Sequence, residues 1–314
     1  MRVLVTGGAG FVGAFTALEL IEHGHEVVAL DRRAESNDVL AEAGDRVGLV
    51  EGDIQDQERI AAVVNDHGIE GIIHTAAVIG QGLGADSPDW MFNINVVGTL
   101  NVLEVARAAG ARVVYVSTAT LYGQHADLHP LTEEHLPDPV GMYDTTKLMS
   151  ETLVHSYHKI YGMDTVAVRP GYVYGHRNST GGYFLDKVFA GEAIQHESGA
   201  DLPMDVTYVK DLALGLRLAL TVRPIQHRIF NITGGVSRRR SEVADLARQL
   251  VPGAQIALGP GYPAHAHLRG PSVLDRARAE LGYEPRYTLE AGMADWLTYL
   301  RREAARRHAA GQAG

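Results

Sequence analysis

The 314-residue chain contains no cysteine, which excludes disulfide bonds, thiol catalysis, cysteine-type zinc sites and iron–sulfur clusters. Basic side chains are also scarce, with 28 Lys and Arg against 38 Asp and Glu and a net charge of −10. An acidic chain binds polyanions poorly, so we expect neither nucleic acid nor an anionic membrane surface as a partner. No apolar run approaches the roughly 18 residues of a membrane span, and no signal peptide is evident, so we expect a cytoplasmic protein.

Short runs rich in valine, isoleucine and leucine alternate with segments of helical spacing along the chain. Such a pattern indicates a parallel sheet buried on both faces, and right-handed crossovers make it a doubly wound α/β fold. Ligands of this fold bind at the carboxyl ends of the strands. The predicted strands are 2–6, 26–31, 47–51, 71–75, 112–117, 165–169 and 227–232, and the predicted helices are 11–23, 56–67, 90–109, 143–161, 184–190, 211–221, 241–250, 275–281 and 289–302.

The first predicted strand leads directly into a glycine-rich turn and then into a helix. Gly8, Gly10 and Gly13 fit the pattern G-x-G-x-x-G, in which glycine lets the backbone approach a pyrophosphate at the helix N-terminus. Asp31 ends the next strand, 18 residues after Gly13, where a carboxylate accepts both ribose hydroxyls of NAD. These features predict a Rossmann-type dinucleotide site.

The choice between NAD and NADP depends on three neighbouring side chains. The carboxylate of Asp31 repels a 2′-phosphate, whereas Arg32 or Arg33 would pair with one if Asp31 turned away. Because Asp31 comes first and is short, we expect NAD, with NADP as the alternative.

A second pattern, Tyr143-x-x-x-Lys147, places a phenol and an ammonium one helical turn apart. A tyrosine with a pKa near 10 is a poor base at neutral pH, but a neighbouring positive charge stabilises its phenolate. The pair therefore predicts proton transfer beside the dinucleotide.

Further short motifs accompany these two patterns along the chain. They are Gly52-Asp53-Ile54, His74-Thr75-Ala76-Ala77, Asn95-Val96-Val97-Gly98-Thr99, Ser117-Thr118-Ala119-Thr120-Leu121-Tyr122-Gly123, Arg169-Pro170-Gly171-Tyr172-Val173-Tyr174-Gly175, Tyr208-Val209-Lys210-Asp211 and Phe230-Asn231-Ile232-Thr233-Gly234-Gly235. With them the chain resembles the extended short-chain dehydrogenase/reductase family, in its NAD-dependent epimerase/dehydratase group, from Thr6 to about Leu300.

The resemblance implies roles for individual residues. Tyr143 would be the catalytic acid/base, Thr118 would hydrogen-bond the reacting oxygen, and Lys147 would hold the ribose and lower the pKa of Tyr143. Asn95 would fix the active-site helix, or would only bond to nearby backbone. The cofactor contacts that the resemblance implies are Gly7, Gly10, Phe11, Val12, Gly13, Asp31, Arg32, Asp53, Ile54, Ala76, Ala77, Asn95, Tyr143, Lys147, Tyr172 and Val173.

The resemblance also narrows the reaction. Dehydratases of the family carry Asp-Glu directly after the catalytic threonine and decarboxylases keep the Glu, whereas this chain has Ala119 and Thr120. A 4-epimerase or a simple dehydrogenase/reductase therefore remains. A non-catalytic NAD-sensing regulator is disfavoured, because Thr118, Tyr143 and Lys147 are all present.

Two departures from the family pattern bear on the substrate. Tyr172 replaces the usual asparagine and Met204 the usual arginine of enzymes that act on nucleotide sugars. We therefore expect a sugar-like secondary alcohol without a nucleotide, and the alternative is a nucleotide-sugar 4-epimerase of the UDP-glucose type. The candidate substrate-binding residues are Thr120, Tyr122, His176, Arg177 and Arg269, and His176 is also a candidate second acid/base.

Two domains and a tail are predicted. Residues 1–172 and 206–235 would form the NAD-binding domain, residues 173–205 and 236–303 a smaller C-terminal substrate-binding domain, and residues 304–314 a flexible tail.

Histidines are numerous, 15 in all, but scattered through the sequence, and no metal site is predicted. The ones considered are His74, His125, His129, His135, His155, His158, His265 and His267.

The family likeness also implies a homodimer through the two long helices. Its seam would contain Val96, Leu100, Leu103, Leu153, Tyr157 and Ile160, unless these face the sheet of their own subunit.

Overall fold

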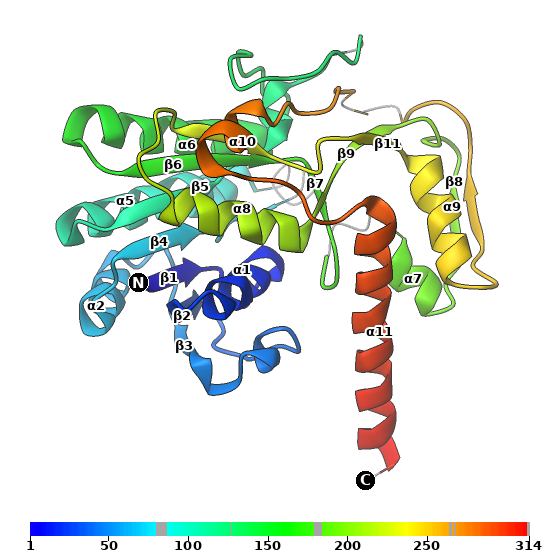
Figure 1. Cartoon of the computed structure of the whole chain (residues 1–314), viewed down its shortest axis with the longest axis horizontal. Coiled ribbons are helices and arrows are strands. Elements are labelled where there is room, and N and C mark those ends of the chain that lie inside the picture. Colours follow the sequence, from blue (N-terminus) through cyan, green and yellow to red (C-terminus); the bar gives the residue numbers. More distant parts are fainter. Residues whose placement is uncertain (80–86, 126, 179–183, 264–265, 267, 313–314) are drawn as a thin grey trace.

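The computed structural model describes residues 1–79, 87–125, 127–178, 184–263, 266 and 268–312 (Figure 1). Its largest element is a seven-stranded sheet in the order β10-β6-β5-β4-β1-β2-β3, in which all neighbouring strands are parallel. The strands are β1 (Arg2–Thr6), β2 (Glu26–Asp31), β3 (Val47–Glu51), β4 (Gly71–His74), β5 (Arg112–Val116), β6 (Thr165–Pro170) and β10 (Ile229–Ile232). The predicted doubly wound, Rossmann-type sheet is confirmed.

Apolar residues on both faces of this sheet explain why helices cover both sides. On β1, Val3 and Val5 belong to one buried cluster and Leu4 to the other, because successive strand residues point to opposite faces. Helices α1 (Phe11–Glu22) and α8 (Val209–Thr221) pack against each other on the first face. Helices α2 (Gln57–His67), α5 (Gly98–Ala109) and α6 (Met142–Tyr161) pack on the second.

The strand order places a crevice beside β1. The chain first adds β2 and β3 on one side of β1 and then β4, β5 and β6 on the other. The direction therefore reverses between β1 and β4, and a doubly wound sheet binds its ligands at the carboxyl edge of that point. The glycine-rich turn and the end of β4 both lie there.

The rest of the chain forms smaller elements beside this sheet (Figure 1). Strands β7 (Tyr172–Tyr174), β9 (Pro203–Tyr208) and β11 (Ser237–Arg239) form a three-stranded sheet, and β8 (Ile194–His196) pairs with β12 (Ile256–Leu258). The helices are α7 (Leu185–Phe189), α9 (Arg240–Leu250), α10 (Asp275–Leu281) and α11 (Leu289–Gln312). The predicted domain borders after residues 172 and 205 fall inside β7 and β9, and the two-domain division stays a prediction.

Two predicted elements differ from the structure. The helix expected over 90–109 consists of α4 (Pro88–Phe92), a π-helical turn (Asn93–Val97) and α5. Helix α11 continues to Gln312, where a flexible tail was expected from residue 304, because the segment is rich in the helix formers alanine, arginine and glutamate. Shorter 3₁₀ turns occur at Leu40–Glu42, Gly44–Arg46 and Ala119–Tyr122.

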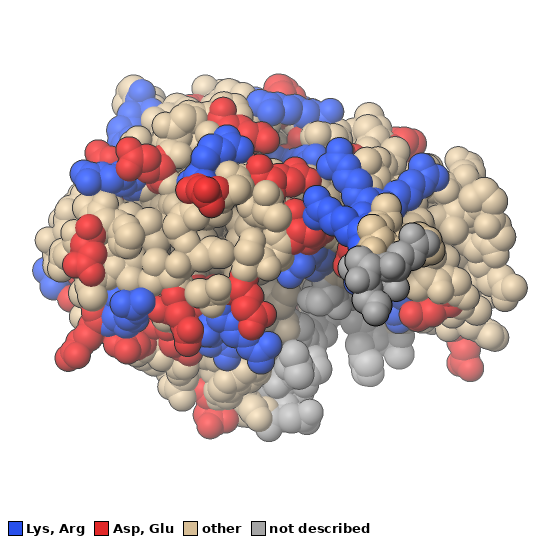
Figure 2. All heavy atoms as spheres, turned by 90° about the horizontal axis from the view of Figure 1, so that it is seen from below, with Lys and Arg blue, Asp and Glu red and all other residues tan. Residues whose placement is uncertain are grey.

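Two further features of the structure concern the expected absence of a polyanionic partner and of a membrane span, namely the surface charge and the length of the apolar helices. On the face shown in Figure 2, acidic and basic side chains are interspersed. Among the described residues, no helix combines the length and the apolar character needed to cross a membrane.

Candidate active site

The glycine-rich turn between β1 and α1 is built so that only glycine fits. Gly7 has a φ of +67°, and a Cβ on Gly13 would lie 2.1 Å from the carbonyl oxygen of Gly7. A Cβ on Gly8 would lie 2.6 Å from the Cβ of Ala29. Gly10 caps the start of α1 and donates its N–H to the carbonyl of Gly7 at 2.9 Å. The N–H groups of Gly8, Ala9 and Gly10 have acceptors within the protein, so the N-terminus of α1 is the part that can bind a phosphate, and the turn lets a dinucleotide approach it.

The predicted ribose acid lies next to this turn. Asp31 ends β2, and its Oδ2 accepts a hydrogen bond from the N–H of Ala9 at 3.2 Å. Arg32 and Arg33 follow it and are exposed. The carboxylate is thus fastened beside the phosphate turn while the two guanidinium groups face solvent, an arrangement that fits NAD better than NADP.

The other predicted cofactor residues lie at neighbouring strand ends. Asp53 and Ile54 follow β3, where Asp53 Oδ1 accepts from the N–H of Gln55 at 2.9 Å and Ile54 is buried. The backbone of Ala76, after β4, comes within 2.9 Å of the position of a Cβ on Gly7. The remaining ones, Phe11, Val12, Ala77, Tyr172 and Val173, are partly exposed at the start of α1, after β4 and on β7.

Asn95 connects this crevice to the active-site helix. It lies in the π-helical turn and is buried. Its Oδ1 accepts from the N–H of Val78 at 2.8 Å, and its Nδ2 donates to Thr146 Oγ1 on α6 at 3.0 Å. The side chain therefore links α6 to the segment after β4 and also bonds to the backbone of Val78, so the contacts fit both roles weighed for it.

Tyr143 lies in the first turn of α6 and shares a hydrogen bond with the side chain of Thr118, which follows β5. Burial is the largest cause that raises the pKa of Tyr143, and the Asp144 carboxylate raises it further. The bond to Thr118 acts in the opposite direction. The structure therefore brings together the two predicted hydroxyl groups, and the phenol on its own is a weak acid.

Lys147 is buried one turn further along α6, and its Nζ lies 4.3 Å from the centre of the Tyr115 ring. Burial lowers the pKa of Lys147 to about 7, and the Glu151 carboxylate opposes that shift. Lys147 is not among the charges that set the pKa of Tyr143 here. The effect of Lys147 on the phenol therefore stays a prediction, and burial and Asp144 are the causes that raise the pKa of Tyr143 here.

Asp144 is a functional candidate that the sequence did not single out. Its side chain is completely buried, and its Oδ1 accepts the hydroxyl of Thr120 at 2.5 Å. Thr120 Oγ1 in turn lies 3.0 Å from Thr118 Oγ1. Because a carboxylate only accepts, the protons are ordered from Tyr143 through Thr118 and Thr120 to Asp144. No sequence motif indicated this chain, because it joins residues 24 positions apart through loop geometry.

Three of the predicted substrate residues have structural partners instead. Tyr122 has no exposed surface and donates its hydroxyl to Asn231 Oδ1 at 2.7 Å, which favours a core residue over the expected substrate contact. His176 Nε2 lies 2.5 Å from Asp38 Oδ2, and the Arg177 guanidinium binds the same carboxylate at 3.2 Å. None of the described contacts of His176 or Arg177 joins them to Tyr143.

Arg269 is different, because it is buried and incompletely paired. Its guanidinium lies 5.4 Å from the centre of the Tyr172 ring, and its Nη1 has no hydrogen-bond partner among the described residues. Asp205 nearby is also buried, and burial raises its pKa to about 6. Met204 occupies the preceding position on β9, as the sequence indicated.

A family model for the "NAD dependent epimerase/dehydratase family" matches residues 3–233. The chain belongs to this family. It is therefore an NAD-dependent enzyme of the extended short-chain dehydrogenase/reductase type, as the sequence predicted.

Relatives within the family sharpen the comparison. The chain is 32% identical over 311 residues to a UDP-glucose 4-epimerase of Corynebacterium glutamicum, covering 92% of each chain. A Thermus thermophilus UDP-glucose 4-epimerase in complex with NAD is 26% identical, with a TM-score of 0.83 over 96% of this chain and 99% of that one. A Thermotoga maritima UDP-glucose 4-epimerase with UDP-glucose shares the fold at a TM-score of 0.87 and 24% identity, covering 97% of this chain and 100% of that one.

These relatives do not support one prediction from the sequence. The replacements at Tyr172 and Met204 led us to expect a substrate without a nucleotide, but the relatives are UDP-sugar enzymes. The alternative weighed beside it, a nucleotide-sugar 4-epimerase, fits the relatives better.

Proposed function

We propose that this enzyme is a UDP-sugar 4-epimerase that uses NAD. The observation that carries the proposal is the buried guanidinium of Arg269, whose Nη1 has no hydrogen-bond partner within the described part of the chain. A buried cation needs an acceptor, and a diphosphate offers charge-assisted hydrogen bonds that a free sugar lacks. In this reading Arg269 supplies the positive charge that is missing at Met204.

The proton chemistry belongs to the chain's own residues. NAD, when bound, accepts and returns the hydride. Tyr143 would take the proton of the sugar C4 hydroxyl as the C4 hydride leaves and would return it when the C4 ketone is reduced on its other face, so no net oxidation occurs. We assign Thr118 to hold the reacting oxygen and Lys147 to hold the cofactor ribose and stabilise the phenolate.

A product assay tests this proposal. Purified protein with NAD is incubated separately with UDP-glucose, UDP-glucuronate, free glucose and gluconate, and both C4 inversion and NADH absorbance are followed. We expect inversion of UDP-glucose at C4 without accumulation of NADH. Conversion of only the free sugars, or formation of one NADH per product, would contradict the proposal. Inversion of UDP-glucuronate alone would identify UDP-glucuronate rather than UDP-glucose as the substrate.

We further propose a homodimer through α4, α5 and α6. Two apolar side chains of these helices are exposed, Leu100 on α5 (36%) and Ile160 on α6 (70%). The seam differs from the predicted one, since Val96, Leu103 and Tyr157 are buried within the subunit. Light scattering of Ile160→Glu tests this: the mass should fall from two chains to one, and an unchanged mass would exclude this face.

A further inference from the structure

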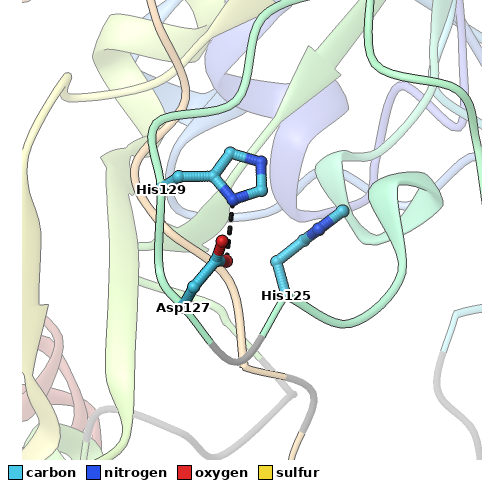
Figure 3. A group of neighbouring side chains, drawn as sticks. All are labelled: His125, Asp127 and His129. Atoms are coloured by element: carbon cyan, nitrogen blue, oxygen red, sulfur yellow. Dashed lines mark hydrogen bonds and ion pairs between the residues drawn. The ribbon is translucent and has the colours of Figure 1, made fainter.

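The loop that follows the Ala119–Tyr122 turn gathers three imidazole rings. His125, His129 and His135 come from a stretch of 11 residues, and their ring centres are 4.8, 5.1 and 6.1 Å apart in pairs. Figure 3 shows the His129 ring hydrogen-bonded to the Asp127 carboxylate, with the His125 side chain beside them on the same loop. The potential ligand atoms of His125, Asp127 and His129 all lie within 4.8 Å of one another.

This clustering departs from the prediction that the histidines are scattered. His74 is buried between Thr6 and Thr99, and His155 and His158 lie on α6, but His125, His129 and His135 converge. His265 and His267 lie outside the described residues.

We propose that His125, His129 and His135 bind one divalent transition metal ion of the Zn²⁺ type, with Asp127 orienting His129 from behind. Three imidazole nitrogens select zinc, cobalt or nickel over magnesium and calcium, which prefer oxygen ligands. The site is separate from the proton-transfer residues, and its existence does not depend on the epimerase reaction.

Hydrogen bonds fix which nitrogen of the first two rings carries a proton. His125 Nε2 lies 2.9 Å from the carbonyl oxygen of Tyr122 and must donate to it, which leaves a lone pair on Nδ1. His129 Nδ1 lies 2.7 Å from Asp127 Oδ1 and donates likewise, which leaves a lone pair on Nε2. Histidines that bind a metal through one ring nitrogen usually donate the N–H of the other ring nitrogen to a carboxylate or a backbone carbonyl.

His135 supplies the third nitrogen. Its Nε2 lies 3.1 Å from His129 Nε2, close to the roughly 3.4 Å that separates two nitrogens of a tetrahedral zinc ion bound at about 2.1 Å. Without metal, His135 Nε2–H donates to His129, while Nδ1 accepts the N–H of Thr132 at 3.0 Å. With metal, the proton moves to Nδ1, where the Thr132 carbonyl oxygen lies 3.2 Å away. In that state the N–H of Thr132 loses Nδ1 as its acceptor, so metal binding replaces one hydrogen bond of a loop that is already folded by another.

The loop also contacts the stretch that carries Arg269. The N–H of His125 donates to the carbonyl of Leu268 at 2.7 Å, and a Cβ on Gly270 would lie 2.1 Å from the carbonyl oxygen of His129. A metal that tightens this loop would thus restrain the segment around Arg269.

Zinc titration of the full chain, purified without a histidine tag and treated with chelator, tests the site. We expect one Zn²⁺ per chain by calorimetry, and at least a tenfold weaker affinity for His129→Gln and for His135→Gln. The matched control is His67→Gln, an exposed histidine at the end of α2, which should bind zinc as the wild type does.

Two further readouts separate a metal site from a purely structural cluster. Cobalt should give the visible absorption of a low-coordinate ion in the wild type and lose it in His129→Gln, and circular dichroism should show that the variants are folded. Failure of the wild type to take up a stoichiometric ion, or equal zinc affinity in the wild type and both variants, would overturn the proposal. Loss of epimerase activity alone would not, since neither readout measures it.

Discussion

Two buried polar regions of this protein differ in how completely the chain satisfies them. At the start of α6, Tyr143, Thr118, Thr120 and Asp144 form a connected series of hydrogen bonds. In the segment before α10, Arg269 keeps a buried nitrogen without a partner among the described residues. The first region is organised by the chain itself, whereas the second keeps one buried donor, beside Asp205 and the Tyr172 ring, for the anionic ligand that we propose. We therefore expect the proton-transfer residues to be preformed and recognition of the substrate to be completed on binding.

The largest expected effect comes from removing the reactive hydroxyl of the first region. Tyr143→Phe keeps the ring and its packing but eliminates the group that exchanges a proton with the sugar. General acid–base catalysis contributes about 10²–10⁴-fold, so we expect kcat to fall by about a thousandfold. Steady-state kinetics with UDP-glucose measures the loss.

Binding measurements give this variant its control. NAD affinity by calorimetry should change less than about threefold, because the phosphate turn and Asp31 are untouched. If Tyr143→Phe retained wild-type kcat, the proton chemistry would have to be moved to another residue.

A smaller effect is expected in the second region, and it should appear in KM. Arg269→Ala removes the buried cation, and a hydrogen bond to a charged group is worth about 1.5–3 kcal/mol, so KM for UDP-glucose should rise about 10- to 150-fold. Arg269→Lys should recover part of that loss, because it keeps the charge without the planar fork.

The matched control is Arg177→Ala, which removes a more exposed arginine already paired with Asp38. Its KM should stay within about threefold of the wild type, since a pair of this kind contributes little. Equal KM values for Arg269→Ala and Arg177→Ala would remove the argument for a diphosphate at Arg269.

Features encoded by close spacing in the sequence could be predicted, whereas contacts that depend on loop conformation could not. The glycine turn, Asp31 and the Tyr143–Lys147 pair were predicted because each is encoded by close spacing on a strand end or a helix. The Thr120–Asp144 contact and the burial of Tyr122 were missed, because loop conformation decides which side chains meet and which are buried. The convergence of His125, His129 and His135 has the same cause, since spacing within a loop does not fix distance.

The smallest expected effect is a shift in the pH dependence of kcat, and it tests how Asp144 acts on Tyr143 in the first region. Asp144 raises the pKa of Tyr143, so Asp144→Asn should lower that pKa and move the rising limb of the kcat profile to lower pH. Thr118 and Tyr115, which interact with the phenol, and Lys147, which lies over the Tyr115 ring, are unchanged in this variant.

Thr120→Val separates the charge of Asp144 from its hydrogen bond. This variant breaks the series of hydroxyls while the Asp144 carboxylate still accepts from the N–H of Gly141 at the start of α6. We therefore expect a fall in kcat of a few fold without the displacement of the limb toward lower pH. If both variants shifted the limb equally, the hydroxyl of Thr120 rather than the charge of Asp144 would control the phenol. If neither variant moved the limb or changed kcat, Asp144 would serve only to cap α6, and the ordered series from Tyr143 would have no part in the proton transfer.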